Sequence, residues 1–251
     1  MNNLNFKTGR YELKFFVPLH RLDALVRYVR PYVEPDPHAK LDQHGLPRYT
    51  IQSVYLDTER LRFYHEKQDG VMNRRKFRVR IYGSPSDASR AFLEIKFRDN
   101  TQVSKDRIAV PLSDARRIFA HLAAPELPGL SPPQARMLVR YLAAYDTLAL
   151  RPVVNVMYDR TAFVGRTDDT VRFTIDIQLR WQDQRGAAML FEPRSVLPIP
   201  LPGAILELKF NRLMPEWMRR VVRDFDLRQE SISKYAHCVD AAVFSHIEMV
   251  V

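Results

Sequence analysis

The sequence predicts an α+β fold, a closed antiparallel eight-stranded β-barrel with helices packed on its outside. Segments in which charged and apolar residues alternate recur along the chain, as expected of strands with one apolar face. Amphipathic helices separate these segments, and each helix has to bury an apolar stripe. The apolar faces of the strands are the only surface that can cover those stripes. The helices should therefore lie outside the sheet, and the charged faces of the strands should turn away from them, toward solvent in an open sheet or inward in a closed barrel.

A phrase of the form apolar–Glu–apolar–Lys–Phe occurs three times, at residues 11–15, 93–97 and 206–210. Side chains alternate between the two faces of a strand, so Glu12 and Lys14 share one face. The unequal spacing of the three copies excludes a solenoid repeat. Each copy is therefore expected to be a separate strand that contributes a Glu–Lys pair to one common surface.

Five further segments complete a set of about eight strands. In the segment 170–181, strict alternation places Gln178 and Arg180 on the charged face with Asp176, and Trp181 on the apolar face. The five segments are residues 50–58, 73–83, 102–112, 154–163 and 170–181.

Four amphipathic helices are expected between the strands. Ser113 is a candidate N-cap for one of them, which carries Leu122 in its apolar stripe. Another begins with Ser131 at the cap, Pro132 at the first helical position and Gln134 three residues after the cap, which is typical of a capping box. The helices are expected at residues 20–30, 113–122, 131–145 and 215–225.

The composition limits the class of function. The 251 residues are expected to form one domain over residues 1–251, and the net charge of +10 indicates an anionic partner: nucleic acid, a membrane surface or a phosphorylated substrate. Neither the glycine pattern of dinucleotide-binding folds nor that of Walker loops occurs, and the histidines form no metal-binding motif. The single cysteine, Cys238, is expected to be buried in a C-terminal helix and excludes an internal disulfide, which suits a cytoplasmic protein. The sequence contains no apolar run of membrane-spanning length and no signal-peptide core near its start.

Charged faces on antiparallel strands are often simply exposed to solvent, and an open sheet would leave them so. Here, however, lysine and arginine recur on nearly every strand, and they would repel one another unless an anion lay between them. Such side chains suit recognition of successive phosphates, and a few carboxylates among them can hold a divalent cation that bridges phosphate oxygens. The cations are Lys14, Arg78, Arg80, Lys96, Lys105, Arg160, Arg172 and Lys209, and the carboxylates are Glu12, Glu94, Asp176 and Glu207.

The ordered motifs RYELKF, FRVRIY, FLEIKF, VSKDR, MYDRTAF, VRFTIDIQL, ILELKF and SISKYAHC resemble the VTC (vacuolar transporter chaperone) domain. This is the polyphosphate polymerase branch of the triphosphate tunnel metalloenzymes, or CYTH-like superfamily. The resemblance extends from Arg10 to about Asp240. It implies an eight-stranded barrel around a basic tunnel. It also implies transfer of the γ-phosphate of ATP to a growing inorganic polyphosphate chain, with Mn²⁺ or Mg²⁺ as cofactor.

Matched residue by residue, the resemblance also implies site roles. Glu207 would bind the metal, with Asp176 as a second carboxylate, and Tyr158 would make a polar contact. Ser233, Glu12 and Glu94 are further candidates for the substrate site. A lysine in the first turn of a helix opposes the helix dipole, so Lys234 after Ser233 suggests that both bind one anion, the alternative being an exposed lysine without a partner. The expected phosphate contacts are Lys14, Arg78, Arg80, Lys96, Lys105, Arg160, Arg172, Lys209 and Lys234.

One departure bears on the type of reaction. CYTH-type hydrolases and cyclases begin with an ExExK motif, and here Arg10 replaces the first glutamate, which favours the polymerase branch. A non-catalytic polyphosphate-binding module and a tripolyphosphatase remain alternatives. The expected partners are ATP and inorganic polyphosphate or pyrophosphate, and not nucleic acid. The resemblance leaves room for a membrane-associated partner, although the sequence shows neither the inositol-phosphate-sensing domain nor the membrane helices of the eukaryotic complexes.

Overall fold

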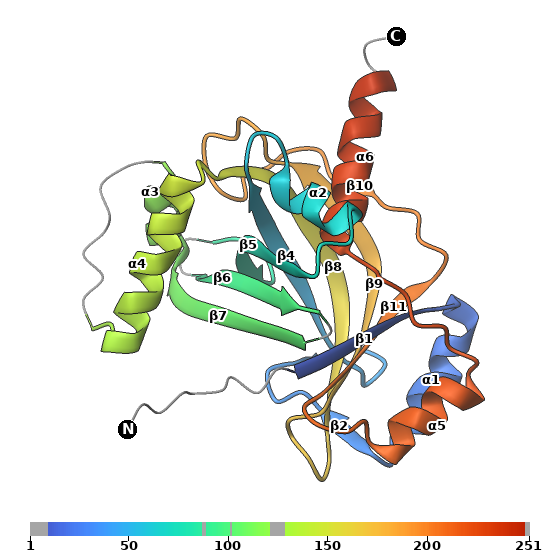
Figure 1. Cartoon of the computed structure of the whole chain (residues 1–251). Helices are drawn as coiled ribbons and strands as arrows, with labels where there is room; N and C mark the ends of the chain where they lie inside the picture. Colours follow the sequence, from blue (N-terminus) through green and yellow to red (C-terminus); the bar gives the residue numbers. More distant parts are fainter. Residues whose placement is uncertain (1–9, 87–88, 101, 121–128, 249–251) are drawn as a thin grey trace.

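The computed structural model of the chain describes residues 10–86, 89–100, 102–120 and 129–248. Eight of its strands form a closed ring in which each strand pairs antiparallel with both neighbours (Figure 1). The expected closed arrangement of eight antiparallel strands is thus confirmed. In order around the ring the strands are β1 (Arg10–Val17), β7 (Gln102–Pro111), β6 (Arg90–Asp99), β5 (Asn73–Tyr82), β4 (Pro47–Asp57), β8 (Arg151–Gly165), β9 (Arg172–Asp183) and β11 (Ala204–Phe210).

Three short strands extend this ring. They are β2 (Val33–Pro35), which pairs with β8, β3 (Lys40–Leu41), which pairs with β4, and β10 (Leu197–Pro198), which pairs with β9.

The junction between β1 and β7 is short, because Arg10 and Tyr11 are the only residues of β1 that pair with β7 among the described residues. The chain segment before the last helix covers the next part of this edge. Phe15 forms a β-bridge with Gln229, and the backbone N–H of Glu230 donates to the carbonyl of Lys14 at 2.9 Å. Segment 229–233 therefore completes the wall of the ring where β7 diverges from β1.

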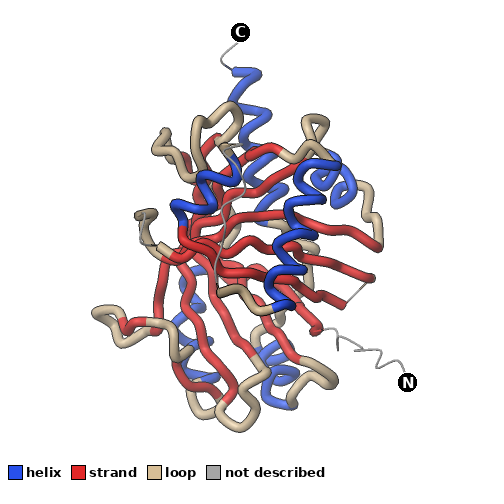
Figure 2. The backbone as a smooth tube through the Cα atoms, turned by 90° about the vertical axis from the view of Figure 1, so that its left-hand side faces the viewer, coloured by secondary structure: helices blue, strands red, loops and turns tan. Residues whose placement is uncertain are grey.

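In the described part of the chain six helices surround the ring, and four of them pack on the outer faces of its strands (Figures 1 and 2). Helices α3 (Leu112–Phe119) and α4 (Pro132–Thr147) cover β5, β6 and β7, and Tyr141 of α4 packs on Phe77 of β5. Helices α1 (Leu22–Val29), which follows a 3-10 turn at Leu19–Arg21, and α5 (Glu216–Asp224) cover β1, β9 and β11. The apolar stripes are therefore buried against the outer faces of the strands, as the amphipathic pattern requires.

Helices α2 (Arg62–Gln68) and α6 (Lys234–Glu248) contact each other at one end of the ring. Helix α6 begins at the inner face of the ring: Tyr235 stacks on Tyr55 of β4 with ring centroids 4.7 Å apart. Along the same helix, Cys238 is fully buried, as expected, and burial raises the pKa of its thiol.

The alternation predicted for β9 holds only as far as Ile177. Gln178 has a φ of +53°, and the pairing with β8 shifts register there, so Arg160 pairs with Asp176 while Val156 pairs with Trp181. Residues paired across antiparallel strands share a face, and this bulge therefore brings Trp181 to the inner face. The expectation for this strand end was wrong, because one extra residue reverses every later side chain.

The reversal has a packing consequence. Leu179 and Trp181 join the apolar cluster around Tyr235 and Val239 of α6. Arg180 instead lies on the outer face, where its guanidinium is 3.0 Å from the Asp159 carboxylate. The bulge thus gives α6 an apolar surface at the end of the ring.

Two helix starts differ in how well the sequence predicts them. Helix α4 has the expected capping box, in which Gln134 Oε1 accepts the Ser131 backbone N–H at 2.8 Å. Helix α3 follows β7 directly with Pro111 at its N-cap, so Ser113 lies inside the helix and its prediction as a cap was wrong. Leu122, placed in the same stripe, lies outside the described residues. Within the described ranges, no helix is both long enough and apolar enough to span a membrane.

Candidate functional site

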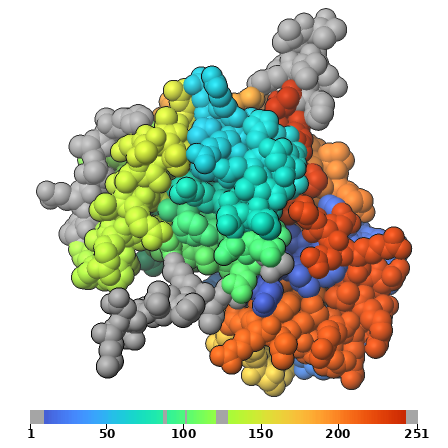
Figure 3. Space-filling model, viewed as in Figure 1, coloured from blue at the N-terminus to red at the C-terminus, as the bar shows by residue number. Residues whose placement is uncertain are grey.

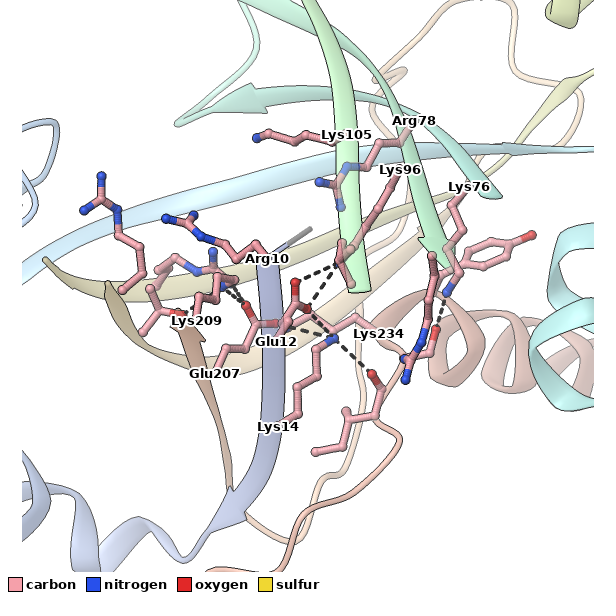
Figure 4. Close-up of a pocket in the computed structure, with 18 of the residues that line it drawn as sticks. Arg10, Glu12, Lys14, Lys76, Arg78, Lys96, Lys105, Glu207, Lys209 and Lys234 are labelled. Carbon is pink, nitrogen blue, oxygen red and sulfur yellow. Dashed lines mark hydrogen bonds and ion pairs between the residues drawn. The ribbon is translucent and has the colours of Figure 1, made fainter. Parts of the chain in front are cut away.

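The inner faces of the strands surround a cavity of about 800 Å³, called the central cavity below (Figure 4). Among the residues that the structure describes, fourteen lysines and arginines line it, against four aspartates and glutamates. The basic residues are Arg10, Lys14, Lys67, Arg74, Lys76, Arg78, Arg80, Lys96, Arg98, Lys105, Arg160, Arg172, Lys209 and Lys234, and the acidic ones are Glu12, Asp36, Glu207 and Glu230. The cavity is therefore a strongly basic compartment inside the ring.

The structure brings the predicted site residues together. Arg78, Arg80, Lys96 and Lys209 all line the central cavity, as expected of one inward-facing surface. All the other predicted residues line it as well, except Glu94 and Asp176. These two carboxylates are 0% and 2% exposed and lie directly behind cavity-lining cations. The roles assigned to these residues in substrate and metal binding stay predictions.

The carboxylate of Glu207 lies among four cations. Its Oε2 accepts hydrogen bonds from Lys209 Nζ at 2.5 Å and from Arg160 Nη2 at 2.8 Å. Its Oε1 accepts one from Lys234 Nζ at 2.8 Å, and Lys14 Nζ lies 3.6 Å away. Burial alone would raise the pKa of Glu207, but these cations outweigh burial and hold its pKa well below the usual range.

Asp176 shares two of these cations. Arg160 donates to it through two guanidinium nitrogens, Nε to Oδ1 and Nη2 to Oδ2, each at 2.6 Å. Lys234 Nζ lies 2.6 Å from Asp176 Oδ2, so its ammonium bridges Asp176 and Glu207. Burial would lower the pKa of Lys234, but the two carboxylates outweigh burial and raise its pKa. Lys234, expected to contact an anion, is therefore held here by two carboxylates of the protein.

Glu94 and Glu12 pair with further cations of the central cavity. Glu94 accepts from Arg78 Nε at 2.7 Å and lies 3.3 Å from Lys105 Nζ. Burial opposes ionisation of Glu94, yet the charge of Arg78, with smaller contributions from other cations, holds its pKa well below the usual range. Glu12 accepts from Lys96 Nζ at 3.0 Å and lies 3.3 Å from Lys14 Nζ (Figure 4).

We call these four carboxylates and the cavity-lining cations that pair with them the paired wall. Its carboxylates are Glu12, Glu94, Asp176 and Glu207, and its cations are Lys14, Arg78, Lys96, Lys105, Arg160, Lys209 and Lys234. The charge-assisted contacts hold these cations in fixed positions around the cavity.

Arg80 has no carboxylate within ion-pair distance among the described residues. Its Nε donates to Ser53 Oγ at 3.0 Å, and its Nη2 lies 3.4 Å from the Tyr158 hydroxyl. The Tyr158 ring also faces the ammonium of Lys234 at 4.8 Å and the guanidinium of Arg160 at 5.4 Å. Tyr158 thus steadies three cations through its ring and hydroxyl without neutralising them.

The first turn of α6 is anchored by residues that the sequence analysis did not select. The hydroxyl of Tyr235 donates to Asp57 Oδ2 at 2.6 Å, and Asp57 also accepts from the backbone N–H of Phe63 at 3.0 Å. Tyr55, which stacks on Tyr235, accepts from Arg78 Nη1 at 3.0 Å. This chain of contacts links the position of α6 to that of Arg78. A tyrosine directly after Lys234 in the sequence was the only available signal for it.

Lys76 was also missed as a site residue, although alternation placed it on the face of Arg78 and Arg80. It lines the central cavity, and its Nζ donates to Ser233 Oγ at 2.7 Å. Ser233 is the residue before α6, and its Oγ also accepts the backbone N–H of Ala236 at 3.2 Å. Ser233 therefore caps α6 and holds Lys76 with the same oxygen.

The two predicted metal ligands, Asp176 and Glu207, already pair with cations of the protein. All four carboxylate oxygens of Asp176 and Glu207 lie within ion-pair distance of lysine or arginine. No cluster of three or more His, Cys, Asp or Glu side chains suited to a metal occurs in the described part of the chain. Mg²⁺ commonly takes one or two protein carboxylates together with phosphate oxygens and water. A cation bound by this pair would therefore have to arrive with a phosphate ligand that takes over the lysines and arginines, and metal binding here stays a prediction.

The profile of one family, described as the VTC domain, matches residues 9–243. The chain is 23% identical to subunit 4 of the vacuolar transporter chaperone complex of Trypanosoma brucei brucei over 94% of its own length, and equally to that of Trypanosoma cruzi. It spans about a third of those relatives, 35% and 34% of their lengths. Among solved structures, a protein of Pyrococcus horikoshii matches with a TM-score of 0.47 at 12% identity, over 92% of this chain and 99% of the other. The family profile covers nearly the whole chain, and the chain therefore belongs to the VTC domain family.

Proposed function

We propose that this protein is a polyphosphate polymerase that transfers the γ-phosphate of ATP to a growing chain of inorganic polyphosphate inside the central cavity. The observation that carries the proposal is the cavity itself, which fourteen basic and four acidic side chains line within a closed ring. A closed ring admits a thin flexible anion and excludes bulky ones. Membership of the VTC domain family supports the same reading.

The chemistry requires positioning and charge stabilisation rather than a protein nucleophile. A terminal oxygen of the acceptor chain forms the new bond to the γ-phosphorus, and the bond from that phosphorus to the oxygen bridging the β- and γ-phosphates breaks, which releases ADP. In this proposal Arg78, Arg80 and Lys96 hold one phosphate chain. Lys209 and Arg160 stabilise the negative charge on the transferring group. Each of these five cations lines the same cavity, which fits that division of roles.

Arg172 and Lys105 extend the set of phosphate contacts in this proposal, since both also line the cavity. A Mn²⁺ or Mg²⁺ ion bound with the substrate would neutralise phosphate charge, and Glu207 with Asp176 are the carboxylates that would hold it. When phosphate enters, Lys209 and Lys234 can exchange their carboxylate partners for phosphate oxygens, which frees those carboxylates for the cation.

ATP, inorganic polyphosphate and pyrophosphate are thus the proposed partners. A membrane-associated partner and a cytoplasmic location stay predictions. Duplex nucleic acid should bind poorly, because a ring that admits a single phosphate chain excludes a double helix. In competition binding, duplex DNA at equal phosphate concentration should fail to displace polyphosphate; efficient displacement would contradict an enclosed binding site.

The direct test incubates the purified protein with ATP and either Mn²⁺ or Mg²⁺ and measures acid-insoluble phosphate polymer, ADP and free phosphate. The proposal expects polymer and ADP in matching amounts. Free phosphate without polymer would identify a tripolyphosphatase instead. Tight polyphosphate binding without nucleotide turnover under either metal would leave a non-catalytic binding module.

Lys209 offers a second test, with Lys40 as a control. Lys209→Ala should weaken polyphosphate binding about tenfold or more as well as turnover, since a charge-assisted contact is lost. Lys40, an exposed lysine of β3, does not line the central cavity, so Lys40→Ala should leave both unchanged. Unaltered binding in Lys209→Ala would remove this residue from the phosphate site.

A further inference from the structure

Four cations of the central cavity lie at its end, on β5, β6 and α2, apart from the predicted phosphate contacts. They are Lys67, Arg74, Lys76 and Arg98. Arg74 lies next to the first residue of β5, Arg98 next to the last residue of β6, and Lys67 in the final turn of α2. Helix α2 packs beside β5 and α6 at this side of the molecule (Figure 3). We call these four residues the rim cluster.

Strand pairing brings like charges of the rim cluster face to face. Arg74 pairs directly with Arg98, and Lys76 pairs directly with Lys96, which in turn pairs with Lys105. Like charges directly opposite on neighbouring strands destabilise a sheet. An inward-facing column of cations therefore runs along the β5–β6 junction and persists at a cost in stability.

Among the described residues, none of the four rim cations has a carboxylate within ion-pair distance. Arg74 donates to the carbonyl of Val71, and Arg98 donates to the carbonyl of Asn100, each at 2.7 Å. Lys76 contacts Ser233 Oγ, and Lys67 Nζ lies 3.3 Å from Gln68 Oε1. These partners are neutral, so they orient the cations without offsetting their charge. Glu66, the carboxylate on the same helix as Lys67, pairs with Arg62, and its charge offsets only part of the effect of burial and Arg98 on the pKa of Arg74.

The electrostatic cost is visible in two pKa values. Burial, together with the charges of Lys14 and Lys96, holds the pKa of the Lys76 ammonium well below its usual range. Burial and the charge of Arg98 lower the pKa of Arg74. A phosphate anion at this position would relieve both effects, since an opposite charge favours the charged form of each group.

The two ends of β5 differ in this respect. Its last residue, Tyr82, lies at the opposite end of the cavity, where Tyr49 and the carboxylate Asp36 also form the lining. The cations of the rim cluster, by contrast, follow one another without an acidic residue. Arg74 and Lys76 are two residues apart on one strand, about 7 Å along it. That spacing lets one flexible anionic chain contact them in succession.

We propose that the rim cluster is a second phosphate-binding site, which holds the part of an inorganic polyphosphate chain that extends out of the central cavity past β5 and α2. The inference rests on the proposed function for the chemical identity of the ligand. It adds a direction to that function, because the growing chain would leave the cavity at the rim cluster and not at the Tyr82 end. It also makes affinity depend on chain length, since a short chain held in the centre would not reach the rim.

Binding of two probes tests this directly: sodium tripolyphosphate as the short chain and long-chain sodium polyphosphate. The double variant Arg74→Gln/Arg98→Gln should weaken binding of the long chain about tenfold or more, since two charge-assisted contacts are lost. Its affinity for tripolyphosphate should stay within about twofold of the unmodified protein. Arg75 supplies a matched control, because it is the exposed neighbour of Arg74, points to the outer face and does not line the cavity. Arg75→Gln should change neither affinity.

Two results would overturn the proposal. Unchanged long-chain affinity in the double variant would show that the rim cluster binds no phosphate. An equal loss for both probes would assign these cations to the central site. The ATP assay separates this inference from the proposed function: rim-dependent binding of long chains without polymer formation supports the site and refutes the polymerase. A protein that binds neither probe refutes both.

Discussion

The paired wall and the rim cluster line one cavity, yet they hold their charges in opposite ways. On the paired wall every cation has a carboxylate within 4 Å, and the single carboxylate of Glu207 pairs with Lys209, with Lys234 and with other cations. In the rim cluster, Arg74 and Lys76 contact only neutral oxygens. Internal counter-ions fix the first set in place before substrate arrives. The second set has only neutral partners, so under the proposed function the comparison separates residues positioned for chemistry from residues that attract an anion.

The first turn of α6 connects these two regions. Lys234 reaches the carboxylates of the paired wall, whereas Ser233 holds Lys76 of the rim cluster. Tyr235 fixes this turn through its hydrogen bond to Asp57. Movement of α6 would therefore alter both regions together.

The largest expected effect comes from Glu207→Gln, which keeps the shape of the side chain and removes its charge. Lys234, which is buried, and three half-buried cations would lose their shared partner, and breaking a buried ion pair from one side costs about 3–5 kcal/mol of unfolding free energy. Polymer formation from ATP should collapse, while polyphosphate binding should survive or tighten because a negative charge has left the cavity. Chemical denaturation and binding titration measure the two effects.

Glu230→Gln is the control for that experiment, since Glu230 lines the same cavity, is exposed and makes no ion pair in the described structure. Its effect on stability should be close to zero. If Glu207→Gln proved no more destabilising than Glu230→Gln, the paired wall would not hold its cations as described.

The next effect concerns Tyr235→Phe, which retains the stacking on Tyr55 and removes the hydrogen bond to buried Asp57. A hydrogen bond to a charged acceptor contributes about 1.5–3 kcal/mol, so the free energy of unfolding should fall by that amount. Affinity for both short and long polyphosphate should fall together, because the turn of α6 serves both regions. A loss confined to one chain length would contradict the link through α6.

A dependence on pH is expected from Lys105. Burial lowers the pKa of its ammonium to about 8, although Glu94 opposes the change. The ammonium proposed to bind phosphate is thus charged below that pH and neutral above it, so polyphosphate affinity should fall about three- to tenfold from about pH 7 to about pH 9. In Lys105→Arg the charge persists, and the decline measured by titration should be shallower. An identical pH profile in the two proteins would exclude Lys105 from phosphate binding.

The smallest effect has the opposite sign to the first. Lys76→Gln removes a half-buried cation that has no carboxylate partner and should raise the free energy of unfolding by about 1 kcal/mol, since repulsion and desolvation are relieved. Lys96 lies directly opposite it, and there the ion pair with Glu12 opposes the effect of burial on the pKa of the ammonium, so Lys96→Gln should give no comparable gain in stability. Thermal unfolding measures both effects. Equal shifts of the two variants in the same direction would contradict the distinction between the two regions.

The sequence predicts the ring well because its governing patterns are local. Alternation in segments such as 73–83 and 206–210 reports one strand at a time, and the amphipathic helices had only the outer faces of those strands to cover. The bulge at Gln178 escaped prediction because it depends on the register with β8, which the sequence of β9 alone does not contain. The cap assigned to Ser113 failed for a similar reason: β7 runs into α3 without an intervening loop.

The sequence predicts which residues belong to the candidate site better than it predicts which of them form ion pairs. Alternation places Glu12 beside Lys14, yet Glu12 also binds Lys96 from a strand that is not its neighbour, a contact that only ring closure creates. Lys234 was expected to meet an anion and instead bridges Asp176 and Glu207. Which cations remain unpaired therefore follows from tertiary geometry, and the rim cluster could not be distinguished from the other inward-facing cations by sequence.

The central claim is that a phosphate chain binds inside the ring, and a crystal structure with bound polyphosphate measures this most directly through the positions of its phosphorus atoms. The account predicts phosphates within hydrogen-bond distance of Arg80, Lys96 and Lys209 in the central cavity, with the chain continuing past Lys76 and Arg74. Phosphates bound only on the outer surface, with these side chains still in their present contacts, would contradict it.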